Sequence, residues 1–132
     1  SPLQKILVGH VNHPAELDSD TRKAFARLRE VGVTLLNQSV ILKGVNDSAN
    51  ILARLSEDLF DSGVMPYYLH AFDPVAGAHH FDVSDQAAAA LVRALMTRLP
   101  GFLVPRLVRE LPGETSKTPV FTGDNQANIS VT

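Results

Sequence analysis

The sequence predicts an α/β fold in which three to four parallel strands alternate with helices. Apolar runs of strand length are separated along the 132 residues by stretches whose apolar residues have helical spacing. In Gly32-Val33 and again in Gly63-Val64, the glycine ends a predicted helix and the valine begins a predicted strand. The two pairs are 31 residues apart, which is about the length of one strand–helix unit. This alternation is typical of a parallel sheet with right-handed crossovers.

The first unit places a strand at residues 5–11 and a helix after the cluster at residues 18–20 (DSD), whose side chains can cap it. Gly32 suits the position just past the end of that helix. The second unit places a strand at residues 33–42. The apolar face of the first helix is formed by Ala24, Phe25, Leu28 and Val31.

The second helix is expected after residues 46–48 (NDS) and ends at Gly63. A third strand follows at residues 64–72. Ser84 caps a third helix, and residues 102–108 form a fourth short strand. The apolar faces of these two helices are formed by Ile51, Leu52, Leu55 and Leu59, and by Leu91, Val92, Leu95 and Leu99.

All four runs are continuously apolar, as parallel strands buried on both faces are. The first domain is therefore expected to span residues 1–112. Residues 113–132 are polar and turn-rich, and we expect them to be a loop or disordered.

Composition excludes several kinds of site. With no cysteine, this chain supplies no thiolate metal site, iron–sulfur ligand or cysteine nucleophile. A net charge of −2 does not indicate a nucleic-acid surface. The sequence shows no signal peptide. It also lacks an apolar run of the ~18–20 residues that a membrane span needs, so we expect a cytoplasmic protein without membrane partners.

Polar residues gather within or just after the C-terminal parts of the predicted strands, where βα folds bind their ligands. A buried unpaired amide costs ~1–3 kcal/mol, so Asn37 or Gln38 needs a partner from the protein or from a ligand. Each residue alone suits a structural network, but four strand ends together favour a ligand site. They are residues 10–13 (HVNH), residues 37–39 (NQS), His70 with Asp73, and Arg106 with Arg109 and Glu110.

Two alternatives remain open from the residues alone. His10, His13 and Asp73 could bind zinc in a metal-dependent (β/α) hydrolase, although the two histidines straddle a strand end. Asp73 also suits a turn into Pro74. His79-His80 is more typical of a loop. A non-catalytic α/β binding module is the second alternative.

Three motifs together resemble the lysine 2,3-aminomutase family of radical S-adenosylmethionine (SAM) enzymes: LLNQSVILKGVNDS, PYYLHAFDPVAGAHHF and VPRLVRELPGETSKTP. The HFDVSD stretch and the SKTP ending look most like its elongation factor P (R)-β-lysylation branch. The resemblance implies an isomerase that converts L-α-lysine to β-lysine, and the C-terminal half of a partial (β/α)6 barrel.

The same resemblance implies three cofactors, a [4Fe-4S] cluster, SAM and pyridoxal 5′-phosphate (PLP). By motif, Lys117 matches the lysine that forms a Schiff base with PLP, and Gln38 and His10 match residues that contact SAM. Asp73 and Glu110 match carboxylates that hold the substrate ammonium. The family's CxxxCxxC cluster motif is absent here, so we expect this chain to be part of a longer protein, inactive alone and prone to self-association.

Overall fold

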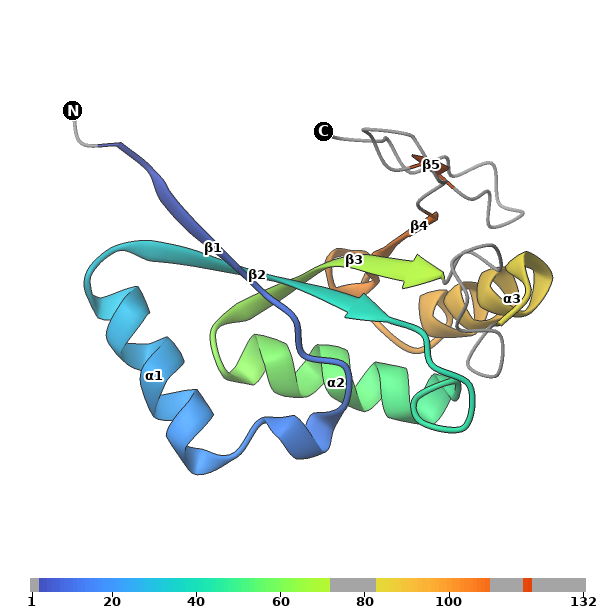
Figure 1. Ribbon diagram of the computed structural model, residues 1–132, viewed down its shortest axis with the longest axis horizontal. Helices are drawn as coiled ribbons and strands as arrows, with labels where there is room; N and C mark the ends of the chain where they lie inside the picture. The colour runs from blue at the N-terminus through green and yellow to red at the C-terminus, as the bar shows by residue number, and fades with distance from the viewer. Residues whose placement is uncertain (1–2, 72–82, 110–117, 120–132) are drawn as a thin grey trace.

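The computed structural model describes residues 3–71, 83–109 and 118–119. Four parallel strands lie side by side in chain order, connected by helices (Figure 1). This arrangement confirms the predicted alternation and the parallel sheet. The strands are β1 (Lys5–Gly9), β2 (Val33–Val40), β3 (Val64–Ala71) and β4 (Arg106–Arg109), and the helices are α1 (Ser19–Glu30), α2 (Ala49–Asp61) and α3 (Asp85–Met96).

Short elements complete the described part of the chain. The 3₁₀ turns η1 (Pro14–Glu16) and η4 (Gly101–Leu103) follow β1 and α3. The two-residue strand β5 (Thr118–Pro119) pairs antiparallel with β4, a strand that the sequence analysis did not predict.

The helix ends are those that the sequence predicts. The side chains of Asp18, Ser48 and Ser84 each accept a hydrogen bond from a backbone N–H in the first turn of their helix. Gly32 and Gly63 have φ values of 88° and 83°, which a glycine tolerates best. These local signals therefore set where all three helices begin and where α1 and α2 end, whereas α3 ends at Met96, before the Leu99 that the prediction placed on its apolar face.

Strand ends differ from the prediction. The first part of the expected strand at residues 102–108 is wrong, because Leu103 N–H donates to the carbonyl of Pro100 at 2.9 Å and closes η4 instead. The first two strands also end earlier than expected, at Gly9 and Val40. Side chains take over the backbone hydrogen bonds beyond these ends, as described below.

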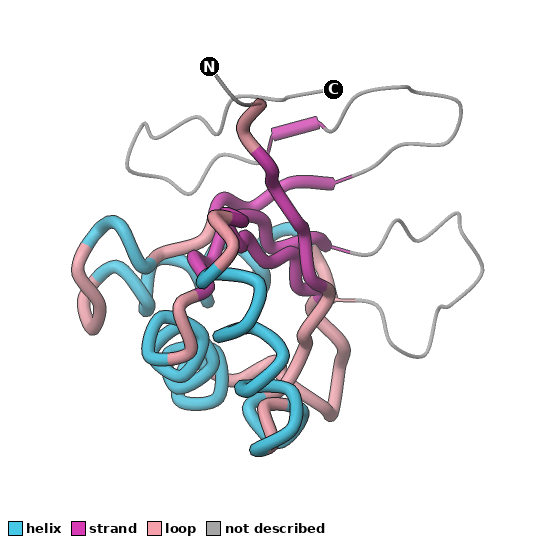
Figure 2. Tube along the Cα trace, turned by 90° about the vertical axis from the view of Figure 1, so that its left-hand side faces the viewer, coloured by secondary structure: helices cyan, strands magenta, loops and turns pink. Residues whose placement is uncertain are grey.

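All three described helices lie on the same side of the sheet (Figure 2). The strands follow chain order without reversal, so the sheet is wound in one direction only. A doubly wound sheet would carry helices on both faces. The arrangement is that of a segment of an α/β barrel.

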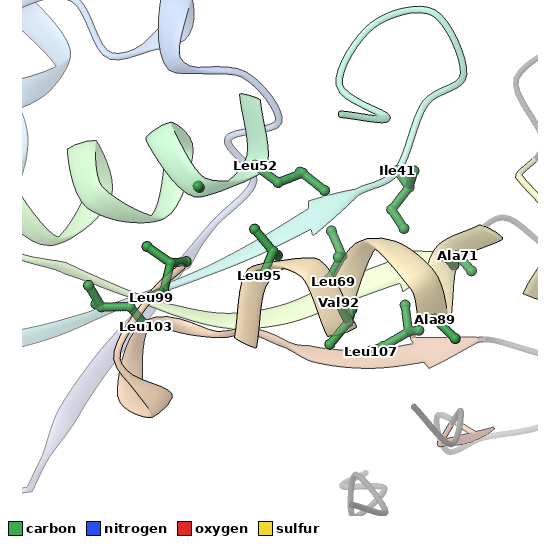
Figure 3. Packing of buried hydrophobic residues seen from close by; sticks show 12 residues of the cluster. Ile41, Leu52, Leu69, Ala71, Ala89, Val92, Leu95, Leu99, Leu103 and Leu107 are labelled. Carbon is green, nitrogen blue, oxygen red and sulfur yellow. The ribbon is translucent and has the colours of Figure 1, made fainter. Parts of the chain in front are cut away.

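Two apolar clusters join the helices to the sheet. In one, Leu69 of β3 and Leu107 of β4 lie against Val92 and Leu95 of α3 (Figure 3). The other cluster consists of Val11, Leu17, Leu35, Leu55, Leu59 and Val64. Helix α2 contributes to both clusters, which ties the two ends of the helical layer together.

Strand β1 does not have the burial expected of a central parallel strand. Ile6 is 60% exposed and Leu7 is 42% exposed. The expectation of burial on both faces is wrong here because β1 is the edge strand, hydrogen-bonded only to β2 among the described residues. No helix in the described ranges is both long and apolar enough to cross a membrane.

Candidate functional site

The chain that leaves β1 is bound to β2 by two buried side chains. Asn37 Oδ1 accepts from Val11 N–H at 2.9 Å, and its Nδ2 donates to the Val11 carbonyl at 3.0 Å. Ser39 Oγ also donates to that carbonyl, at 2.8 Å. The partner that the sequence required for Asn37 is therefore the protein backbone, and this part of the NQS motif is structural.

A second buried amide fastens the loops after β1 and β2 to each other. Asn46 Nδ2 donates to the carbonyls of Asn12 and Val40, each at 2.8 Å. Its Oδ1 accepts from Leu42 N–H at 2.7 Å, which is why β2 stops pairing before that residue. The sequence predicts Asn46 only as part of a capping cluster, because its long-range partners cannot be seen in the sequence.

Gln38, Tyr68 and His70 share the face of the sheet away from the helices. Gln38 and Tyr68 are register partners across β2 and β3, beside an irregularity between Asn37 and Gln38. His70 Nε2 lies 3.1 Å from Gln38 Oε1, and the rings of Tyr68 and His70 have centroids 5.9 Å apart. Arg106 of β4 is the next register partner of Tyr68.

We call Gln38, Tyr68, His70 and the neighbouring Arg106 the open-face cluster. The cluster is polar but has few charged side chains. Burial raises the pKa of the Tyr68 phenol, and the neighbouring phenol of Tyr67 acts in the same direction. The positive charge of Arg106 opposes them. The Tyr68 hydroxyl is buried, whereas the half-buried amide of Gln38 and imidazole of His70 can orient a polar ligand by hydrogen bonds.

Of the five residues to which the family resemblance gives a role, the structure describes two, Gln38 and His10. His10 is exposed and follows β1, whose last residue Gly9 pairs with Asn37, so it lies at the same end of the sheet as Gln38. No contact between His10 and Gln38 is seen. Asp73, Glu110 and Lys117 lie outside the described residues.

The zinc alternative loses one of its ligands to a structural contact. His13 Nδ1 accepts from Ala15 N–H at 3.0 Å and caps η1. Glu16 completes this capping box by accepting from His13 N–H at 2.8 Å. Within the described residues, no group of three His, Cys, Asp or Glu side chains could hold a metal ion. Asp73, His79 and His80 are not among them.

The carboxyl end of β4 is fixed by an ion pair. Arg109 Nη1 lies 3.0 Å from Asp85 Oδ2 in the first turn of α3. Both side chains are partly exposed, so the pair contributes modestly to stability. Its consequence is geometric, because it joins the last residue of β4 to the first turn of α3.

Comparison with known proteins decides the family. The L-lysine 2,3-aminomutase of Escherichia coli is 59% identical over 120 residues, which are 91% of this chain and 35% of that protein. The L-lysine 2,3-aminomutase of Haemophilus influenzae is 52% identical over 116 residues, 88% of this chain and 34% of that protein. This chain belongs to the lysine 2,3-aminomutase family.

More distant members agree. The L-lysine 2,3-aminomutase of Clostridium subterminale is 36% identical over 112 residues, which are 85% of this chain. No protein-family model matches the chain. The chain spans about a third of the length of the first relatives it matches.

The cofactors implied by this family fit the residues of this chain unequally. Gln38 Nε2 makes no hydrogen bond to another described residue, which suits contact with a polar ligand such as SAM. A [4Fe-4S] cluster requires thiolate ligands, and the chain has none. Lys117, the candidate for PLP, is outside the described residues.

Proposed function

We propose that the protein containing this chain converts L-α-lysine to β-lysine by moving an amino group between adjacent carbons. The observation that carries the proposal is the 59% identity to an L-lysine 2,3-aminomutase over 91% of the chain. The geometry supports it. The described helices all lie on one side of the sheet, and the open-face cluster lies on the opposite, polar face, which these helices do not cover.

Each site residue has a role in this proposal. Gln38 and His10 contact SAM, and Lys117 binds PLP. Asp73 and Glu110 hold the side-chain ammonium of lysine, because two carboxylates match the charge of that group. SAM with the iron–sulfur cluster supplies the radical chemistry, and PLP stabilises the migrating nitrogen centre. The cluster ligands lie outside this chain.

We further propose that the product serves the modification of elongation factor P, in the cytoplasm. The support is the likeness of the HFDVSD stretch and of the SKTP ending to that branch of the family. The test is whether cells that lack the protein lose β-lysine from elongation factor P, and whether added β-lysine restores it.

Alone, the chain is proposed to be inactive. Four parallel strands cannot close a barrel, and no cysteine is present to hold the cluster. The partner that completes the site is the remainder of the same protein. The exposed apolar residues of β1 would also support pairing between copies of the chain.

The decisive experiment supplies L-lysine to the cofactor-loaded protein and measures β-lysine by mass spectrometry. Lys117→Ala should lower the rate by about 10²-fold or more. Asp73→Asn should raise KM for lysine more than it lowers kcat. Asp61→Asn, at the exposed end of α2, is the matched control and should change neither. Loaded wild-type protein that forms no β-lysine contradicts the proposal.

A further inference from the structure

The hydrogen bond between Gln38 and His70 fixes which atoms of the Gln38 amide remain available. The bond joins Gln38 Oε1 and His70 Nε2 at 3.1 Å. An amide oxygen can only accept, so the imidazole must carry its hydrogen on Nε2 and donate it. The oxygen of the Gln38 amide is thereby occupied, and the two N–H donors of the same group remain without a partner among the described residues.

The surroundings hold this arrangement in place. Gln38 and His70 are both half-buried, on neighbouring strands and on one face of the sheet. The Tyr68 ring meets the imidazole edge-to-face at 5.9 Å, with an interplanar angle of 66°. An imidazole flanked by this ring has less freedom to rotate than a surface histidine. The direction of the Gln38 amide is therefore set before any ligand arrives.

We infer that His70 is a positioning residue that turns the N–H donors of Gln38 toward an oxygen acceptor of the bound ligand. The acceptor class is a hydroxyl, ether or carboxylate oxygen. The identity of the ligand rests on the proposed function, in which Gln38 contacts SAM, a molecule with ribose hydroxyls and a carboxylate. His70 acts through Gln38 and need not touch the ligand itself.

The first test measures the imidazole tautomer in the ¹⁵N-labelled chain by long-range ¹H–¹⁵N correlation. We expect the neutral His70 ring to carry its hydrogen on Nε2. Gln38→Glu should preserve this tautomer, because a carboxylate also accepts, whereas Gln38→Leu should release it. A wild-type His70 with its hydrogen on Nδ1 overturns the inference, as does a tautomer that Gln38→Leu leaves unchanged.

The second test measures SAM binding to the cofactor-loaded protein by calorimetry. His70→Phe should weaken binding about tenfold, and His70→Gln, whose amide can still donate, should recover part of it. Gln38→Glu should lose binding while keeping the tautomer, since it retains the acceptor for His70 but removes the N–H donors. Arg54→Gln, on the exposed side of α2, is the control.

The outcomes separate the inference from the proposed function. Unchanged SAM affinity in His70→Phe overturns the inference, provided that circular dichroism shows a folded variant. Wild-type protein that does not bind SAM contradicts the proposed function instead. In that case the tautomer measurement still decides whether His70 orients Gln38.

Discussion

Asn37 holds the backbone of Val11 by two hydrogen bonds, accepting from its N–H at 2.9 Å and donating to its carbonyl at 3.0 Å. One side chain thus replaces the strand partner that β1 loses after Gly9. The contact keeps the chain close to β2 just before Asn12 and His13, so a buried amide determines the path of the loop that carries part of the candidate site.

Asn37→Ala should lower the free energy of unfolding by about 1–3 kcal/mol, because it leaves the buried Val11 N–H and carbonyl with fewer partners. Urea unfolding followed by circular dichroism measures the change. Thr34→Ala, on the same strand but exposed, should stay within about 0.5 kcal/mol of wild type. Equal losses in both variants would show that the network is not the cause.

Asn46→Ala should destabilise the protein more than Asn50→Ala does. Asn46 is fully buried and makes three hydrogen bonds to backbone groups, so its loss should cost about 1–3 kcal/mol. Asn50, in the first turn of α2, is exposed. Chemical unfolding of the two variants makes the comparison, and a similar midpoint for both would contradict the assigned role of Asn46.

Acid should reduce the stabilisation of the fold by the N-cap of α1, and Asp18→Asn should remove this pH dependence. The backbone N–H of Thr21 donates to Asp18 at 2.8 Å and lowers the pKa of that carboxyl from its ordinary value of 3.8. A lowered folded-state pKa stabilises the fold above pH 3.8, and this contribution is lost as the pH falls through the folded value.

The check is a series of urea unfolding midpoints between about pH 5 and pH 2. Asp18→Asn keeps a capping oxygen but cannot titrate, so its midpoint should fall less over this range than that of wild type. Asp20→Asn, in the same turn, is the control. Parallel curves for wild type and Asp18→Asn would rule out the carboxylate as the source.

The chain by itself should self-associate through β1, whose edge is unpaired among the described residues and whose Ile6 and Leu7 are exposed. Sedimentation velocity over a range of concentrations measures this. Leu7→Lys should shift the distribution toward monomer, because a charged edge strand resists pairing. Val31→Lys, which removes an even more exposed apolar residue at the end of α1, should not. If both variants shift the distribution alike, non-specific association of exposed apolar residues, and not pairing at the β1 edge, causes the self-association.

The difference between neighbouring residues of the NQS motif was not predictable. Asn37 and Ser39 face the helical layer, whereas Gln38 faces away from it. Strand alternation predicts that consecutive residues face opposite sides, but not which side the helices occupy. The register irregularity beside Gln38 is what brings it opposite Tyr68 and within reach of His70.

By itself, the sequence determined the alternation of strands and helices, the caps at Asp18, Ser48 and Ser84, and the family. These depend on local spacing, capping chemistry and motif order, which the chain carries within a few residues. Only the tertiary structure decided which polar residues are structural and which face the candidate site. That assignment depends on contacts between residues some 30 positions apart, such as Gln38 and His70, and on the single side of the sheet that the helices cover.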